Sequence, residues 1–117
     1  MKILLVEDNE LTRYVMKALL TKLGHEIVGE AENGEKAVQF FTRLKPDVVF
    51  LDLILPGKSG IEVLEDLRSV DPKTRVVIIT AVDQAEIDRR LSGKSVHAIL
   101  RKPFSYGDFK TLMISLS

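Results

Sequence analysis

Five short apolar runs alternate with five amphipathic stretches along the chain. The runs lie at Ile3–Val6, Glu26–Val28, Val48–Leu51, Val76–Ile79 and Val96–Leu100. Four of them are rich in β-branched residues and do not alternate with polar residues, which is typical of strands covered on both faces by helices. The run at Glu26–Val28 is interrupted by charge and followed by Gly29. We therefore expect an edge strand there.

The stretches between the runs have the spacing of amphipathic helices. The first apolar stripe repeats every four residues, at Leu11, Val15, Leu19 and Leu23, and stops at Gly24. Residues that favour helix N-caps open the four later stretches, at Asn33, Ser59, Asp83 and Ser105. Five aromatic residues on strand or helix faces are expected in the core: Tyr14, Phe40, Phe41, Phe50 and Phe109. Strict alternation of strands and helices predicts a doubly wound, five-stranded parallel α/β sheet with helices on both faces.

Composition narrows the function without selecting one. The 117 residues fit a single domain, 1–117, and the absence of cysteine excludes a disulfide scaffold and a thiolate metal site. Seventeen basic and seventeen acidic residues give zero formal net charge, so we predict no direct binding of nucleic acid. No apolar run is long enough to span a membrane, and no secretory signal opens the chain, so we expect a cytoplasmic protein.

Polar side chains end four of the five predicted strands: Glu7 with Asp8, then Asp52, Thr80 and Lys102. The carboxyl ends of parallel strands meet at one edge of a sheet, where ligands bind in such folds. Three clustered carboxylates repel one another unless a cation neutralises them, and their hard oxygens suit Mg²⁺. A carboxylate can also attack phosphorus, while a hydroxyl and an ammonium group stabilise phosphoryl oxygens. The pattern therefore predicts a phosphoacceptor site.

Four motifs, in this order on alternating strand–helix units, resemble those of the receiver domains of two-component response regulators. They are Leu5–Asn9, Asp52–Gly60, Ile79–Ala81 and Lys102–Phe104. The resemblance covers essentially the whole chain and implies a flavodoxin-like (βα)5 fold with strand order 2-1-3-4-5. It also implies a phosphorylation-activated switch of a phosphorelay, one that catalyses only its own phosphorylation and dephosphorylation.

The resemblance implies roles for the acidic residues. Asp52 would accept a phosphoryl group from the phosphohistidine of a sensor histidine kinase or of a histidine phosphotransfer protein. Mg²⁺ would be bound directly by Asp8, Asp52 and the backbone carbonyl of Ile54. Glu7 would act on the metal mainly through a water molecule.

The resemblance also implies a switch around the acceptor. Lys102 would contact the phosphoryl oxygens, and its peptide bond to Pro103 would be cis. The Thr80 hydroxyl would turn toward the phosphoryl group, and the backbone amide of Ala81 would bind it. The family usually has an aromatic residue three positions before the lysine, where this chain has Ile99. We therefore predict that Ile99 and the loop after Thr80 shift together.

The response would bias the surface of the fourth helix, fifth strand and fifth helix toward a downstream protein or a self-dimer. Only one short helix follows Lys102, so we expect no output domain in this chain and a partner elsewhere, unless the chain is the receiver of a longer regulator. Ile54 and Val82 lie two residues after the acceptor and the threonine, and the resemblance implies that these positions flank the path of the attacking water. Because apolar side chains cannot orient water, we predict slow self-dephosphorylation.

Three other functions are alternatives. A receiver-like protein-interaction module would work without phosphorylation, although such modules usually lose the acid pair, the acceptor or the lysine. An aspartate-nucleophile phosphohydrolase needs a second carboxylate two residues after the nucleophile, where this chain has Ile54. A flavin-binding protein would need a phosphate-cradling loop after the first strand, where Glu7 and Asp8 would repel phosphate.

Overall fold

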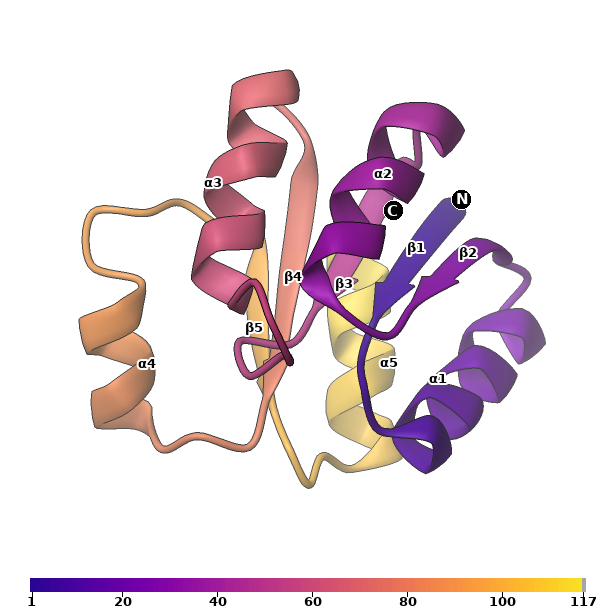
Figure 1. Cartoon of the computed structure of the whole chain (residues 1–117). Helices are drawn as coiled ribbons and strands as arrows, with labels where there is room; N and C mark the ends of the chain where they lie inside the picture. The colour runs from indigo at the N-terminus through magenta and orange to yellow at the C-terminus, as the bar shows by residue number, and fades with distance from the viewer. Residues whose placement is uncertain (117) are drawn as a thin grey trace.

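The computed structural model describes residues 1–116 as one sheet of five parallel strands flanked by five helices (Figure 1). The strands are β1 (Lys2–Val6), β2 (Glu26–Ala31), β3 (Val48–Leu51), β4 (Arg75–Thr80) and β5 (Ala98–Arg101). The helices are α1 (Glu10–Lys22), α2 (Gly34–Leu44), α3 (Gly60–Val70), α4 (Gln84–Arg90) and α5 (Tyr106–Ser115). The strand order is β2-β1-β3-β4-β5, which confirms the predicted doubly wound topology. The strand at Glu26 is an edge strand, as predicted.

Two apolar clusters fill the space between the sheet and its two helical layers. Leu4 and Val6 of β1 point into the cluster under α2, α3 and α4, whereas Ile3 and Leu5 point into the cluster under α1 and α5. Alternate residues of one strand thus serve both layers, as the period of two in a strand requires. This explains why the inner strands are uninterrupted apolar runs.

The helix starts agree with the sequence. The side chains of Asn33, Ser59, Asp83 and Ser105 each accept a hydrogen bond from the backbone N–H three residues later. Each of these caps satisfies a backbone N–H that has no partner inside the helix. A fifth cap, Asn9, opens α1 by accepting from Thr12 N at 2.8 Å.

The buried face of α1 differs from the predicted stripe. Met16 and Leu20 are buried, whereas Leu11 is 71% exposed and Tyr14 is 70% exposed, so neither belongs to the core. Val15 is exposed as well. Four residues turn an α-helix by about 400°, so a strict four-residue repeat drifts by about 40° at each step and leaves a single face. Leu19 and Leu23 of the predicted stripe pack, partly buried, against the cluster that contains Met16 and Leu20, so the stripe was wrong in its first half only.

The last strand starts later than predicted. Val96 and His97 precede β5, and His97 N donates to Val76 O at 2.8 Å. Val96 packs against the cluster under α2, α3 and α4 from a loop. An apolar side chain buried from a loop looks the same in sequence as the first residue of a strand. No helix among residues 1–116 is both long and apolar enough to cross a membrane.

Candidate functional site

Three carboxylates gather where β1 and β3 end. Glu7 and Asp8 follow β1, and Asp52 follows β3. The strands are neighbours, and Asp52 N donates to Val6 O at 3.1 Å, so the two strand ends lie side by side. One oxygen from each carboxylate lies within 4.8 Å of the others. The structure thus brings together the acidic residues singled out from the sequence.

Lys102 reaches this acidic group from the end of β5, which is an edge strand of the sheet. Its backbone N–H donates to Thr80 O at 2.7 Å, which holds the end of β5 against the end of β4. Its Nζ lies 2.6 Å from Glu7 Oε1 and 2.9 Å from Asp52 Oδ2. The peptide bond between Lys102 and Pro103 is cis. A single ammonium group therefore bridges the two buried carboxylates.

Backbone N–H groups orient the same carboxylates. Asn9 N donates to Glu7 Oε2 at 3.2 Å, and Ile54 N donates to Asp52 Oδ1 at 3.0 Å. Arg13 Nη1 donates to the backbone carbonyl of Glu7 at 2.8 Å and ties the β1–α1 turn to α1. Each of the two carboxylates is consequently held by one backbone N–H group of its own and by Lys102. These contacts of Asn9 and Arg13 were not anticipated from the sequence, although an asparagine before a helical stretch is a recognisable N-cap.

Burial and charge together set the protonation of the site. Burial raises the pKa of Glu7 above its ordinary value, the hydrogen bond from Lys102 opposes this rise, and the charge of Asp52 adds to it. Burial also acts to lower the pKa of Lys102, but the hydrogen bonds to Glu7 and Asp52 outweigh it and the pKa is raised. Lys102 therefore stays positively charged at neutral pH and serves as the counterion of the buried pair.

Thr80, Ala81 and Ile54 lie at or just after the same strand ends, whereas Ile99 lies further back on β5, beside Ile78. Thr80 is fully buried, and Val82 N approaches its hydroxyl oxygen at 3.4 Å, near the upper limit for a hydrogen bond. Ala81 is exposed directly after β4. Ile99 is 39% exposed on β5, and Ile54 is 49% exposed after the acceptor. The threonine hydroxyl is thus weakly held, and an exposed backbone segment follows it.

Gly60 is part of the site although its chemistry gave no reason to single it out. A Cβ at this position would lie 2.3 Å from Asp52 O and 2.5 Å from Leu53 Cα. Gly60 N also donates to Leu53 O at 3.0 Å. The start of α3 therefore packs directly on the backbone that carries Asp52. Such a close approach requires glycine.

The donor set fits a hard divalent cation. Asp8 is exposed and makes no hydrogen bond or ion pair with any other residue of the 1–116 segment, so its carboxylate is available to a ligand. Mg²⁺ prefers carboxylate and carbonyl oxygens and retains several waters, which an open acidic edge allows. Glu7, Asp8 and Asp52 could hold the ion together with the carbonyl of Ile54.

We expect Mg²⁺ to stabilise the protein through Asp8. At about one hundred times its dissociation constant, an ion that binds only the folded state raises the free energy of unfolding by about 2.7 kcal/mol. The D8N variant should lose most of this gain in urea unfolding with and without MgCl2, because one ligand charge is missing. The D88N variant, which changes an exposed aspartate on α4, should keep it. An undiminished gain in D8N would contradict the assignment.

Known proteins are similar to this chain in sequence and in fold. The family model of the response regulator receiver domain matches residues 3–113 of this chain. The chain is 31% identical over 103 residues to the chemotaxis protein CheY of Thermotoga maritima, which covers 88% of this chain and 86% of that protein. The response regulator domain of CheB from Thermotoga maritima matches with a TM-score of 0.84 at 25% identity, over 99% of this chain and 96% of that chain. The CheX–CheY–BeF3–Mg complex from Borrelia burgdorferi shares the fold, with a TM-score of 0.92 at 24% identity over 99% of this chain and 88% of that chain.

Proposed function

Because this chain belongs to the response regulator receiver domain family, we propose that it is a phosphorylation-activated signalling switch whose acceptor is Asp52. The observation that carries the proposal is the contact of one ammonium group, Lys102 Nζ, with both Asp52 and Glu7 beside the free carboxylate of Asp8. A site for the simple burial of charge would have no use for a third, unpaired carboxylate. A site for phosphoryl transfer uses it to hold a metal ion.

The proposed reaction moves one phosphoryl group between two side chains. An oxygen of Asp52 attacks phosphorus, the bond from phosphorus to the imidazole nitrogen of the donor breaks, and the electron pair returns to that nitrogen. Bound Mg²⁺ would supply charge neutralisation at the phosphoryl oxygens. Lys102 Nζ is 2.9 Å from Asp52 Oδ2. Once Asp52 is phosphorylated, this ammonium group can donate a hydrogen bond to a phosphoryl oxygen and neutralise part of its charge. We propose that the protein catalyses only this transfer to itself and the later hydrolysis.

We propose that Thr80 and Ala81 carry the response outward. The Thr80 hydroxyl, weakly held by Val82 N, can rotate toward the phosphoryl group, while the N–H of Ala81 donates to it. Ile99 lies beside Ile78 in the pairing of β5 with β4 and is partly exposed, so it can repack as the loop after Thr80 moves. The surface that changes comprises α4, β5 and α5, and we propose it as the site for a downstream protein or a second copy.

A phosphodonor would dock on α1. An apolar groove of about 470 Å³ runs between α1 and the segment after β5, and it shares Ala81 and Lys102 with the phosphoacceptor site. The exposed Leu11 and Val15 line it, so the apolar positions of α1 that miss the core face this groove. We propose that a sensor histidine kinase or a histidine phosphotransfer protein covers the groove while its phosphohistidine reaches Asp52. A cytoplasmic location, with no direct contact to nucleic acid, is part of the same proposal.

Incubation with acetyl phosphate and Mg²⁺, followed by intact mass measurement, tests the function. We expect a mass increase of one phosphoryl group that hydroxylamine removes. The adduct should be absent from the D52N variant and from samples treated with a chelator, and present in D88N. If the wild-type protein forms no adduct with Mg²⁺, the interaction module that works without phosphorylation becomes the better description.

The hydrolysis rate of the adduct should depend on residue 54. Ile54 is 49% exposed next to the acceptor and offers no group that could orient an attacking water. The I54N variant places an amide there, and we expect its phosphoryl group to decay about tenfold faster, since a positioned polar group is worth about one to two kcal/mol of barrier. The decay of the adduct after removal of acetyl phosphate measures this. Equal decay rates for I54N and the I54V control would contradict the role of residue 54.

A further inference from the structure

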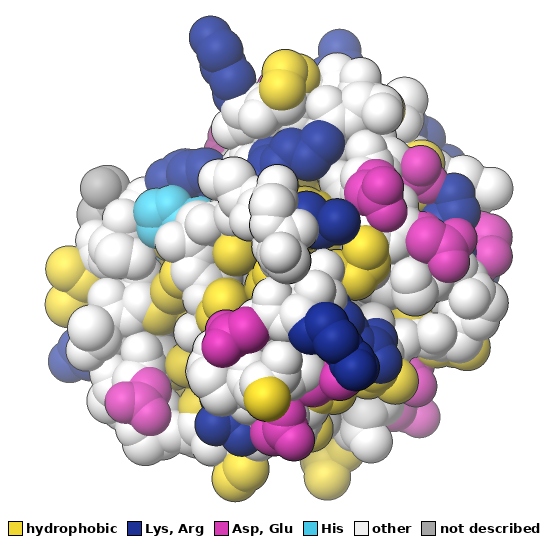
Figure 2. Space-filling model, turned by 90° about the vertical axis from the view of Figure 1, so that its left-hand side faces the viewer, with side chains coloured by type: hydrophobic (Ala, Val, Ile, Leu, Met, Phe, Trp, Pro, Cys, Tyr) yellow, Lys and Arg dark blue, Asp and Glu magenta, His cyan; other side chains and the backbone are white. Residues whose placement is uncertain are grey.

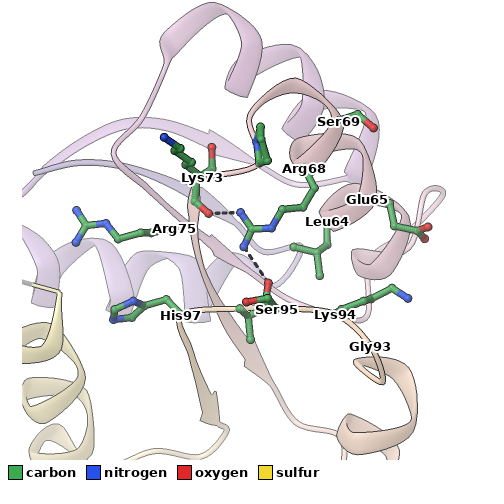
Figure 3. A pocket seen from close by; sticks show the side chains of 13 residues that line it. Leu64, Glu65, Arg68, Ser69, Lys73, Arg75, Gly93, Lys94, Ser95 and His97 are labelled. Carbon is green, nitrogen blue, oxygen red and sulfur yellow. Dashed lines mark hydrogen bonds between the residues drawn. The ribbon is translucent and has the colours of Figure 1, made fainter.

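A second cavity lies at the amino ends of the strands, at the opposite end of the sheet from Asp52. It has a volume of about 730 Å³ at the amino ends of β4 and β5. Its walls are the last turns of α3, the loop 71–74 and the loop 91–97, as Figure 3 shows. The phosphorylation proposal assigns no role to these segments.

Positive charge collects around this cavity. Arg68, Lys73, Arg75 and Lys94 line it, whereas Glu65 is its one acidic lining residue. None of the four basic groups has a carboxylate oxygen within 4.0 Å among residues 1–116. Figure 2 shows Lys and Arg side chains gathered on the upper part of the corresponding face. Arg75 Nη1 donates to Leu116 O at 2.6 Å, and its side chain points away from Arg68 in Figure 3. Arg68, Lys73 and Lys94 therefore form a local excess of positive charge in a chain with zero net charge.

Arg68 gives the cavity a fixed cationic centre. Its Nη2 donates to Ser95 O at 2.9 Å and its Nη1 donates to Thr74 O, so that one guanidinium joins α3 to both loops (Figure 3). A guanidinium has five N–H groups, and these two bonds leave three for a ligand. Lys73 and Lys94 are exposed on opposite loops, and their side chains point away from Arg68 in Figure 3, so they would turn inward only to meet a bound ligand.

We propose that this cavity binds a small anion with two or more linked phosphate groups, such as a nucleoside polyphosphate or an inorganic polyphosphate. Several cations on different walls are better satisfied by a chain of phosphates than by one. Arginine matches phosphate oxygens through its planar fork, and lysine supplies mobile point charges. The volume lies within the ordinary range of small-molecule sites, and the partly buried Val96 lines the cavity with apolar surface.

Calorimetric titration of the full chain in metal-free buffer with pyrophosphate, tripolyphosphate, ATP, adenosine and an acidic peptide tests the proposal. The metal-free condition keeps phosphate off the acidic site, which needs Mg²⁺ to accept anions. We expect pyrophosphate and ATP to bind and adenosine not to bind. Tighter binding of ATP than of tripolyphosphate would identify a nucleotide site, and equal binding an inorganic one. Tighter binding of an acidic peptide than of either would overturn the proposal in favour of a protein partner.

Two double variants separate a site from diffuse attraction. K73Q/K94Q removes two cavity charges without touching Arg68, and we expect the affinity for pyrophosphate to fall about tenfold or more. K2Q/K45Q removes two exposed charges outside the cavity lining and should change the affinity less than about threefold. Equal weakening in both variants would overturn the proposal, as would amide shifts in the NMR spectrum near Glu7 and Asp52 in place of residues 64–75 and 93–97. The D52N variant should bind pyrophosphate normally whether or not the phosphorylation proposal holds.

Discussion

Replacement of Lys102 by methionine is expected to slow phosphorylation of Asp52 by about a hundredfold or more and to increase the affinity for Mg²⁺. Loss of one positioned group that stabilises transition-state charge costs about 10²–10³ in rate. The same ammonium group neutralises Glu7 and Asp52 in the resting protein, at 2.6 and 2.9 Å. Its removal leaves Glu7 and Asp52 without their cation, next to the unpaired Asp8, so a divalent ion gains more by binding. The two effects have opposite signs because Lys102 assists the phosphoryl group but competes with the metal.

The rate of adduct formation from acetyl phosphate and a Mg²⁺ titration of the same samples check both effects. K110M, which removes an exposed lysine on α5, is the matched control and should behave like the wild-type protein in both measurements. Slower phosphorylation with weaker Mg²⁺ binding would point to a collapsed site. Unchanged phosphorylation would contradict the role of Lys102 directly.

The K102M variant also has a defined pH dependence of stability. Burial already raises the pKa of Glu7, and the hydrogen bond from Lys102 opposes that rise, so the variant should raise this pKa further. A carboxyl group with a raised folded-state pKa stabilises the fold in its protonated form and costs stability as the pH rises through that pKa. The deficit of K102M relative to the wild-type protein should therefore be largest at neutral pH and shrink as the pH falls through the Glu7 pKa. Urea unfolding without Mg²⁺ measures it.

The candidate site residues could be predicted from the sequence because each one directly follows a single apolar run. Asp52 follows β3 directly, and Lys102 follows β5 directly, so the end of each apolar run locates them. Parallel strands then bring the ends together without further information. The two bonds from Lys102 to Glu7 and Asp52 were not predictable, since they depend on side-chain conformations at the strand ends.

Features that depend on how one element packs against another could not be predicted, because the sequence pattern does not show which residues meet in space. The face that α1 turns to the sheet depends on how the helix docks, and so Leu11 and Tyr14 were misplaced while Met16 was overlooked. The bond from Arg13 to Glu7 O depends on the same docking. Gly60 reads as an ordinary helix-start residue until the backbone of Asp52 lies against it. Periodicity records which residues are apolar, not which neighbour they meet.

The structure predicts a large destabilisation on replacement of Gly60 by alanine. The added methyl group would lie 2.3 Å from Asp52 O and 2.5 Å from Leu53 Cα, which are backbone atoms that no rotamer change can move. Relief requires α3 to shift from the end of β3, where Gly60 N donates to Leu53 O and Asp52 N donates to Val6 O. Overpacking of this kind costs about 3 kcal/mol.

Gly107 provides the matched control because alanine fits there without a clash. It lies in the first turn of α5, and the nearest atom to its added Cβ would be Ser105 Oγ at 3.7 Å. Since alanine favours the helix more than glycine does, G107A should stabilise the protein by about 0.5–1 kcal/mol, while G60A destabilises it. Urea unfolding of both variants measures the difference, and equal free energies of unfolding would contradict the packing of α3 on the acceptor strand. Because the displaced backbone is that of Asp52, G60A should also slow adduct formation under conditions where the variant is still fully folded, whereas G107A should not.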